Sequence, residues 1–193
     1  MNLLIISWIF ISYFIAAIPF GLLIANVNNV DIRNIGSGNI GATNVYRSMG
    51  AKYGILVFFL DALKGGIPTY VATLIGPLPW FHITVGAIAI LGHSLSCYVK
   101  FKGGKGVATG AGVILALSPL IGISVVTLAF LLIYFTRYVA LTSIICSIIT
   151  PLLFFSLGYP NSYSIMFSII GLFIIFRHRS NIKRLLEGTE NKV

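Results

Sequence analysis

Three short polar segments of the chain combine glycine with side chains that bind phosphate, and the first covers residues 36–47. It reads Gly-Ser-Gly-Asn-Ile-Gly-Ala-Thr-Asn-Val-Tyr-Arg. Its three glycines allow backbone amides to approach an anion closely, and its short polar side chains add neutral hydrogen-bond donors. Arg47 ends the segment with a planar guanidinium that fits phosphate, and a helix beginning at Ala42 would point its N-terminus toward the same anion. The segment therefore predicts a phosphate site, with a flexible polar linker as the alternative.

The second segment, residues 101–109, reads Phe-Lys-Gly-Gly-Lys-Gly-Val-Ala-Thr. It is similar to a phosphate-binding loop that leads into a helix. It is not a Walker A nucleotide motif, because no glycine lies five residues before Gly104. A basic anchor at the membrane surface is the alternative, but an anchor does not need glycines. We therefore expect Gly103, Gly104 and Gly106 to let the backbone surround a phosphate.

The third segment, residues 177–190, follows the last apolar run and reads Arg-His-Arg-Ser-Asn-Ile-Lys-Arg-Leu-Leu-Glu-Gly-Thr-Glu. His178 and Asn181 are three residues apart, so they would share one face of a helix. His178 can act as a general base or as a hydrogen-bond donor to phosphate. An interfacial histidine among arginines is the alternative. Both functional roles stay open at this point.

Other kinds of chemistry lack the residues that they require. The chain has four acidic residues, Asp31, Asp61, Glu187 and Glu190, which are too few and too dispersed for two-metal catalysis. No spacing of His and Cys is typical of a zinc site, so we expect no metal and no other cofactor. The two cysteines lie far apart, and the chain has neither a GxSxG motif nor a His-x4-Asp motif. A covalent nucleophile is therefore not predicted.

The composition predicts the kind of secondary structure that carries these three segments. Of the 193 residues, 58% are hydrophobic and 9% are charged, with a net charge of +9. Soluble domains are about one quarter charged, so this chain cannot cover a surface exposed to water. Long apolar runs favour helices over the alternating strands of a barrel. The sequence predicts an all-α integral membrane protein whose positive charge serves orientation, lipid or an anionic substrate rather than nucleic acid.

About seven transmembrane helices are predicted from the apolar runs. Roughly 20 residues span a bilayer, so the 29-residue run at 107–135 is too long for one upright helix. Ser118-Pro119 is typical of a helix start, and we predict two short or tilted helices there. Asp61 and Lys64 lie one turn apart in the second run, where they can pair. The other runs are 3–25, 53–75, 80–92, 139–157 and 163–176.

The basic residues determine the predicted orientation, because positive charge stays in the cytoplasm. They fall within 33–64, 100–105 and 177–192 and at 137, whereas the turns at 76–79, 118–119 and 158–162 carry none. We therefore predict the N-terminus outside and the C-terminus in the cytoplasm. The cytoplasmic segments 36–47, 93–109 and 177–190 would then build one active site in a single domain spanning residues 1–193.

Taken in order, the polar motifs resemble one family. They are Ser-Gly-Asn-Ile-Gly-Ala-Thr-Asn-Val-Tyr-Arg at 37–47, Gly-His at 92–93, Lys-Gly-Gly-Lys-Gly-Val-Ala-Thr at 102–109 and His-Arg-Ser-Asn-Ile-Lys-Arg-Leu-Leu-Glu-Gly-Thr-Glu at 178–190. Over almost its whole length the chain is similar to the bacterial acyl-phosphate:glycerol-3-phosphate acyltransferases (PlsY). The resemblance implies acyl transfer from acyl phosphate to the 1-hydroxyl of glycerol 3-phosphate. The products are lysophosphatidic acid and phosphate, in the first acylation of phospholipid synthesis.

The resemblance also implies roles for individual residues. The cradle for the acyl phosphate comprises Ser37, Gly38, Asn39, Gly41, Thr43 and Asn44. The glycerol-phosphate side comprises Arg47, Lys105, His178 and Asn181, with Ser143 as a neighbour, and Gly103, Gly104 and Gly106 act mainly through glycerol 3-phosphate. The residues expected to be catalytic are Ser37, Arg47, His178 and Asn181. The base is either a substrate phosphate or His178.

Two other classes of function are alternatives to an enzyme. An anion or phosphate-ester transporter would need accessible sites on both membrane faces, but the predicted outer turns are short and carry no charge. A scaffold or lipid-binding protein is the other alternative. For the enzyme, the expected partners are the two substrates, membrane lipids and the soluble enzyme that forms acyl phosphate. Its expected location is the cell membrane, with the active site on the cytoplasmic face.

Overall fold

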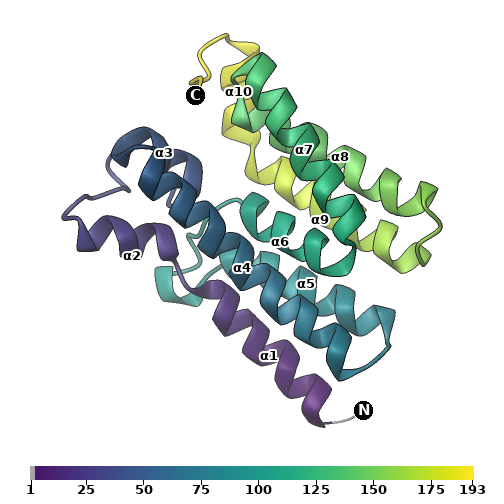
Figure 1. The fold of residues 1–193 in the computed structure, drawn as a ribbon. Coiled ribbons are helices and arrows are strands. Elements are labelled where there is room, and N and C mark those ends of the chain that lie inside the picture. The colour runs from purple at the N-terminus through teal and green to yellow at the C-terminus, as the bar shows by residue number, and fades with distance from the viewer. Residues whose placement is uncertain (1–2) are drawn as a thin grey trace. The chain divides into compact units, whose positions relative to one another are not determined.

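The computed structural model describes residues 3–193, which form helices joined by loops (Figure 1). These residues contain ten α-helices and one short 3-10 helix, and no β-strand occurs among them. The predicted all-α class is confirmed. The helices are α1 (Leu3–Ala17), α2 (Phe20–Val27), α3 (Ala42–Met49), α4 (Ala51–Ile75), α5 (Pro79–Ser94), η1 (Cys97–Val99), α6 (Val107–Leu117), α7 (Pro119–Thr136), α8 (Val139–Ser156), α9 (Asn161–Arg177) and α10 (Arg179–Leu186).

The chain divides into two compact units, Met1–Leu117 and Ser118–Val193. The first contains α1 to α6, and the second contains α7 to α10. The polar segments 36–47 and 101–109, with the residues from 93 onward that lead into the second, therefore belong to the first unit. The segment 177–190 belongs to the second, as does Ser143 on α8.

Proline and glycine set several helix ends in the first unit. The apolar run predicted as one helix over residues 3–25 is two helices, because Pro19 has no N–H group with which to continue α1. Together α1 and α2 still form one candidate membrane span, Leu3–Val27. Gly50, with a φ of +92°, separates α3 from α4 in a backbone conformation that favours glycine. The loop between α2 and α3 carries the first polar segment.

Helix α4 is central to the first unit, since α1, α2, α3, α5 and α6 all contact it. Glycine permits the close approach of α4 to α6. A Cβ at Gly65 would lie 2.5 Å from the carbonyl oxygen of Thr109, and a Cβ at Gly112 would collide with the carbonyl of Ala62. Small residues at such a crossing let membrane helices pack closely. This contact fixes the start of α6 against α4, and with it the end of the second polar segment.

In the second unit, α7 begins where the sequence predicts. Ser118 is its N-cap and accepts a hydrogen bond from the N–H of Ile121 at 3.3 Å, while Pro119 takes the first helical position. Helix α8 packs along α9. Helix α10 leaves α9 at an angle of 60°, and His178 lies at the bend. The third polar segment therefore begins where the apolar helix ends.

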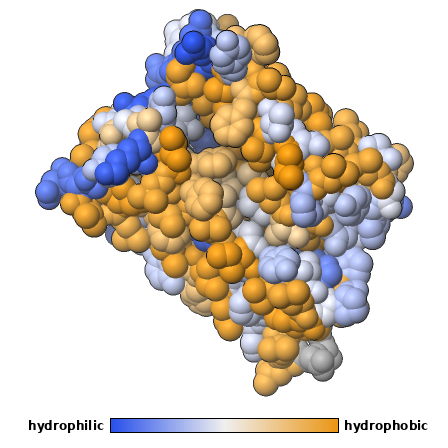
Figure 2. Space-filling model, viewed as in Figure 1, coloured by the Kyte–Doolittle hydropathy of each residue, from blue (hydrophilic) through white to orange (hydrophobic). Residues whose placement is uncertain are grey.

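Five helical stretches among the described residues, counting α1 with α2 and α5 with η1 as one stretch each, are long and apolar enough to cross a membrane. The number is six if α9 and α10 also count as one span. Helix α6 has 11 residues and would be about 16 Å long, which is shorter than the ~30 Å hydrocarbon core of a bilayer. These stretches agree with the predicted integral membrane protein, whereas the seven crossings and their orientation stay predictions. Figure 2 shows hydrophobic side chains over most of the visible face, with hydrophilic residues over the α2–α3 loop and around the C-terminal end.

Candidate active site

The loop that leads into α3 is held together from inside by Asn44, which is 2% exposed. Its Nδ2 donates to the carbonyl oxygens of Ile32 at 3.1 Å and Ile35 at 3.0 Å. Its Oδ1 accepts a hydrogen bond from the N–H of Ser37 at 3.0 Å. Because these bonds bind the buried amide to the loop, Asn44 supports the first segment internally. Its expected contact with substrate stays a prediction.

Two further features shape the same loop. The side chain of Asn39 accepts a hydrogen bond from the N–H of Gly41 at 2.8 Å. Gly38 has a φ of +67°, and a Cβ there would lie 2.9 Å from the carbonyl oxygen of Arg33. The backbone therefore requires glycine at this position. These turns leave Ser37 exposed, where a ligand can reach its hydroxyl.

Helix α3 carries Thr43 and Arg47, which are four residues apart and therefore share one face. Both residues are half-buried. The helix begins at Ala42 as predicted, with Gly41 as its N-cap. The N-terminus of a helix carries partial positive charge that favours an anion. The first segment thus combines this helix end with a guanidinium one turn further along.

Residues 100–106, which include the start of the second segment, form a tight loop folded onto the end of α5. The N–H of Gly103 donates to the carbonyl of Ser94 at 3.1 Å, and that of Gly104 donates to the carbonyl of His93 at 3.3 Å. A Cβ at Gly103 would collide with the His93 carbonyl, and a Cβ at Gly104 would collide with the His93 ring. These glycines therefore have a packing role within the chain. Their predicted close approach to a substrate phosphate would be additional.

Unusual backbone conformations mark both ends of this loop. The φ angle is +54° at Lys100 and +60° at Phe101, and it is +84° at Gly106, immediately before α6. Left-handed conformations cost free energy in residues with a Cβ and persist only where the surrounding fold imposes them. Lys105, which precedes the last of these positions, is half-buried. The path of the loop is therefore set by the fold around it.

One apolar cluster joins the two segments of the first unit. Ile40 and Val45 from the first segment belong to the same buried core as Val99, which precedes the second. Val57 of α4 and Ala25 of α2 complete the cluster together with Ile32. The structure therefore places both glycine-containing loops on a shared core, as a common site requires.

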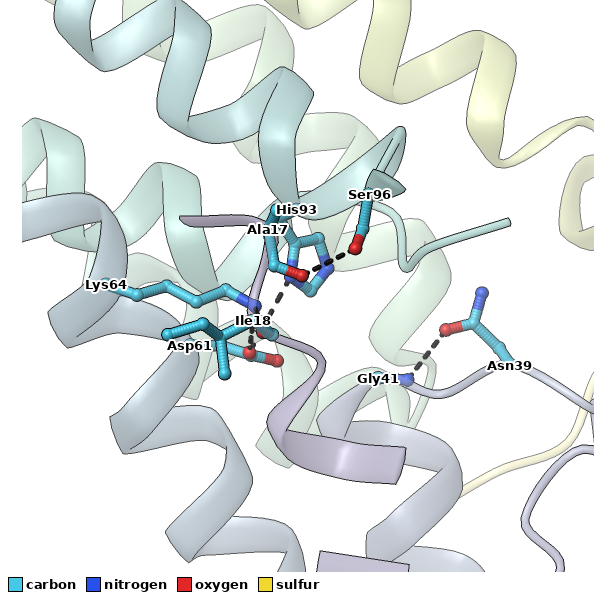
Figure 3. A network of polar contacts seen from close by, with 8 residues as sticks. All are labelled: Ala17, Ile18, Asn39, Gly41, Asp61, Lys64, His93 and Ser96. Carbon is cyan, nitrogen blue, oxygen red and sulfur yellow. Dashed lines mark hydrogen bonds and ion pairs between the residues drawn. The ribbon is translucent and has the colours of Figure 1, made fainter. Parts of the chain in front are cut away.

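A buried ionic network lies beside these loops, and sequence reasoning predicts only part of it (Figure 3). Lys64 Nζ and Asp61 Oδ1 are 2.7 Å apart, which confirms the predicted pair. The Nδ1 atom of His93 lies 3.6 Å from the same carboxylate oxygen. All three side chains are at most 6% exposed. The sequence does not predict His93 as a partner, because His93 comes from a different helix, α5. The one sequence feature that points to it is an ionisable residue at the end of an apolar run.

His178 lies at the bend between α9 and α10 and is 3% exposed. Its Nδ1 donates to the carbonyl of Ile174 at 2.8 Å, since a carbonyl oxygen can only accept. A neutral ring in this tautomer presents Nε2 as an acceptor, and only the protonated ring can donate from Nε2. The two roles predicted for His178 therefore correspond to two protonation states of one ring orientation.

Asn181, on the first turn of α10, is held by an acid from the C-terminal tail. Its amide donates to Glu190 Oε1 at 2.8 Å, and Oε2 of the same carboxylate accepts from Arg184 Nε at 2.7 Å. Glu190 is itself 7% exposed. The sequence does not predict that Glu190 holds Asn181, since it shows only an acid in a basic tail. Ser143 on α8 is buried, and its hydroxyl donates to the carbonyl of Val139 at 2.8 Å.

The predicted site residues thus form two sets. The first unit holds the two glycine-containing segments, and the second holds His178, Asn181 and Ser143. Within residues 3–193, no group of three or more His, Cys, Asp or Glu side chains could hold a metal ion. Loop amides, a guanidinium, an ammonium and an imidazole bind phosphate esters and stabilise developing negative charge. Each of the two sets therefore has side chains that suit the binding of a phosphate-bearing molecule.

Sequence comparison shows which proteins the chain is similar to. A family model described as glycerol-3-phosphate acyltransferase matches residues 6–188. A glycerol-3-phosphate acyltransferase of Fusobacterium nucleatum is 46% identical over 187 residues, which cover 96% of each protein. One from Aquifex aeolicus is 47% identical and covers 94% of this chain and 95% of the relative.

Two solved structures are similar to the chain in fold as well. They are crystal structures of PlsY (YgiH), an integral membrane glycerol 3-phosphate acyltransferase. The glycerol 3-phosphate form matches with a TM-score of 0.94 and 44% identity, covering 98% of this chain and 95% of that one. The lysphosphatidic acid form matches with a TM-score of 0.91 and 43% identity, covering 97% and 94%.

Proposed function

The chain belongs to the glycerol-3-phosphate acyltransferase family and is an integral membrane protein; on that premise we propose that its acyl donor is an acyl phosphate. The acyl group passes to the 1-hydroxyl of sn-glycerol 3-phosphate. The products are lysophosphatidic acid and inorganic phosphate. In this proposal the reaction is the first acylation step of phospholipid synthesis.

The observation that carries the proposal is the pair of glycine-containing loops on one core of the first unit. One loop leads into α3, which carries Arg47, and the other leads through Lys105 into α6. Two anion sites suit a reaction in which donor and acceptor both carry phosphate. The crystal forms of the relative, one with glycerol 3-phosphate and one with lysphosphatidic acid, support the acceptor and the product.

The chemistry requires little covalent assistance from the protein, because an acyl phosphate is a mixed anhydride with a good leaving group. The 1-hydroxyl oxygen attacks the acyl carbonyl carbon, the carbon–oxygen bond to phosphate breaks, and the hydroxyl proton passes to a base. Catalysis then comes from positioning the two substrates and from stabilising the negative charge that develops in the transition state. The proposed donor cradle comprises Ser37, Gly38, Asn39, Gly41, Thr43 and Asn44. The proposed acceptor side comprises Arg47, Gly103, Gly104, Lys105, Gly106, Ser143, His178 and Asn181.

We assign the role of base to a substrate phosphate, which takes the hydroxyl proton. His178 instead donates a hydrogen bond to phosphate. The bond from Nδ1 to the carbonyl of Ile174 supports this assignment, because it orients the ring. In its protonated form the ring then presents a charged N–H at Nε2, and a charge-assisted bond to phosphate is stronger than a neutral one. His178 as the base is the alternative within the same geometry.

The proposed location is the cell membrane, with the polar segments on the cytoplasmic face. The clustering of Lys and Arg in these segments supports that orientation. The hydrocarbon tail of the donor can stay among apolar helices while its phosphate lies at the polar loops. A soluble enzyme that forms acyl phosphate is the proposed protein partner, since it would deliver the donor to this face.

The proposal is tested with the detergent-purified chain and radiolabelled glycerol 3-phosphate, with acyl phosphate or acyl-CoA supplied as the donor in parallel reactions. We expect labelled lysophosphatidic acid from acyl phosphate and none from acyl-CoA, with Arg47→Ala as the inactive control. Product from acyl-CoA alone would contradict the proposed donor. Folded protein that binds glycerol 3-phosphate but forms no product from either donor would contradict the enzymatic proposal.

A further inference from the structure

The buried network of Asp61, Lys64 and His93 has no part in the reaction steps proposed above. Its three side chains are at most 6% exposed, and two of them lie on α4, which is apolar and long enough to cross a membrane. Buried ionisable groups carry a large desolvation cost, and well-packed apolar residues in their place are often no less stable. A role besides stability is therefore the better explanation of this network.

At one end, Lys64 of the network and the nearby Ser96 together hold the break between α1 and α2. Lys64 Nζ donates to the carbonyl of Ile18 at 2.6 Å, and the hydroxyl of Ser96 donates to the carbonyl of Ala17 at 2.6 Å. These carbonyls lie where Pro19 interrupts the hydrogen-bond pattern of α1, and the Ile18 carbonyl also accepts the N–H of Phe20 at 3.1 Å. A cation at this position also complements the helix dipole. The end of α1 is thereby tied to α4 and to the residues that follow α5.

At the other end, His93, whose ring lies beside Asp61 in Figure 3, connects the network to the second polar segment. Its Nδ1 faces Asp61 at 3.6 Å, which is within ion-pair range but longer than a hydrogen bond. Its Nε2 lies against Gly104, since a Cβ at that glycine would collide with the atom. The carbonyl of His93 also accepts the N–H of Gly104 at 3.3 Å. The ring and the backbone of His93 therefore both contact the residue before Lys105.

We propose that Asp61 and His93 are positioning residues for the second segment. The Asp61 carboxylate orients the His93 ring, the ring supports Gly104, and Gly104 places Lys105 for the phosphate of glycerol 3-phosphate. The inference rests on the proposed function, in which Lys105 binds the acceptor. His93 acts through the loop and does not touch substrate, because its Nε2 edge faces the loop backbone.

A purely structural role for the network predicts a different result, namely lower stability with unchanged affinity for glycerol 3-phosphate in the folded protein. Replacing Asp61 alone would leave the Lys64 ammonium buried without its carboxylate, which is strongly destabilising. The double variant Asp61→Asn/Lys64→Met removes both charges together, and such replacements are often tolerated. It keeps the volume of the pair while depriving His93 of the carboxylate.

The test measures the dissociation constant of glycerol 3-phosphate by calorimetry without acyl donor, the KM of each substrate and the thermal midpoint. His93→Gln is the deciding variant, and Asp61→Asn/Lys64→Met is the second. The matched control is His82→Gln, because His82 is a buried histidine on the first turn of α5 whose Nε2 bonds the carbonyl of Gly76. We expect both test variants to bind glycerol 3-phosphate about tenfold more weakly, as after loss of one hydrogen bond to a charged group.

In the same variants, the KM of acyl phosphate should stay near its wild-type value, and His82→Gln should bind glycerol 3-phosphate normally. Adding His93→Gln to the double variant should weaken binding no further, because the carboxylate acts through the ring. Wild-type affinity in folded His93→Gln, or an equal loss in His82→Gln, would overturn the inference. A wild-type protein that binds glycerol 3-phosphate but rejects acyl phosphate would refute the proposed donor while leaving this binding result intact.

Discussion

We expect the contribution of Arg47 to depend on the geometry of its guanidinium as well as on its charge. A guanidinium can form two parallel hydrogen bonds to phosphate, whereas an ammonium acts as a point charge. We expect Arg47→Lys to lower kcat/KM by roughly 10²–10³-fold with the fold intact, the size of losing a preorganised donor to developing charge. The measurement is steady-state kinetics of purified protein, with Arg33→Lys, an exposed arginine before the site, as the control. Near-normal turnover of Arg47→Lys would show that two-pronged binding is not used.

The pH profile of His178 distinguishes donation from base catalysis. With Nδ1 bound to the carbonyl of Ile174, donation from Nε2 requires the protonated ring. A donor role therefore predicts that activity falls as pH rises and the imidazole loses its proton, whereas a base role predicts a fall as pH drops. We expect the first result. His178→Gln should then keep part of the activity and lose the alkaline limb of the wild-type profile.

The opposite result for His178→Gln has a clear signature. A loss of roughly 10²–10⁴-fold, together with disappearance of an acid limb, would identify His178 as the general base. A phosphate monoester titrates at pH ~6. This titration of the substrate phosphate should remain in both proteins, and it serves as an internal reference. His82→Gln removes a different buried histidine and should leave the whole profile unchanged.

At the scale of single residues, the sequence indicates which side chains can bind phosphate but not how each is held. Arg47 and His178 stand out by type and position. By contrast, the amide of Asn44 is bound within its own loop, and Asn181 is held by Glu190 from the C-terminal tail. Such contacts depend on tertiary distances, which residue spacing along one helix does not report.

Substitution of Gly104 tests whether the glycines of the loop between α5 and α6 serve packing, ligand approach or both. A Cβ at Gly104 would push against the ring of His93, so Gly104→Ala should displace the loop that carries Lys105. We expect its KM for glycerol 3-phosphate to rise about tenfold, as for one lost charge-assisted contact, with a smaller change for acyl phosphate. Gly76→Ala is the matched control, because a Cβ there meets nothing within 4 Å. A rise in the acyl-phosphate KM alone would contradict the prediction.

At the scale of helices, the sequence predicts a helix end correctly where a local residue pattern marks it. Ser118-Pro119 predicts the start of α7, and the structure confirms it. Pro19 carries a comparable signal inside the first apolar run, yet the run was predicted as one helix because hydropathy is continuous across it. The close packing of α6 on α4 depends on glycines of two helices meeting, and no spacing within either helix specifies that partner.

The orientation of the whole molecule in the membrane is testable by cysteine labelling in intact cells. In a Cys97→Ser/Cys146→Ala background, exposed Ser180→Cys should resist a membrane-impermeant maleimide until the cells are permeabilised, because Arg and Lys around it favour the cytoplasm. Gly76→Cys, in the uncharged turn between α4 and α5, should be labelled from outside. Labelling of Ser180→Cys in intact cells would overturn the predicted orientation.

For the molecule as a whole, composition alone identifies a helical membrane protein, because so few charged residues cannot cover a soluble surface. The number of crossings is less determined by composition. Helix α6 is short for a span, and α9 with α10 form a bent pair, so length and hydropathy give five or six candidates where the charge pattern favours seven. Helix length and charge placement report different properties, and only labelling separates them.

Both glycine-containing loops follow apolar helices, α2 in one case and α5 in the other. We expect the proposed donor, which has a hydrocarbon tail, to reach such loops by diffusing in the plane of the bilayer, while glycerol 3-phosphate arrives from water. Donor occupancy then depends on its mole fraction in the amphiphile and not on moles per litre. Adding lipid or detergent at constant acyl phosphate should then dilute the proposed donor in two dimensions and slow turnover, without changing acceptor occupancy. An apparent KM for the donor therefore describes the surrounding amphiphile as much as the protein.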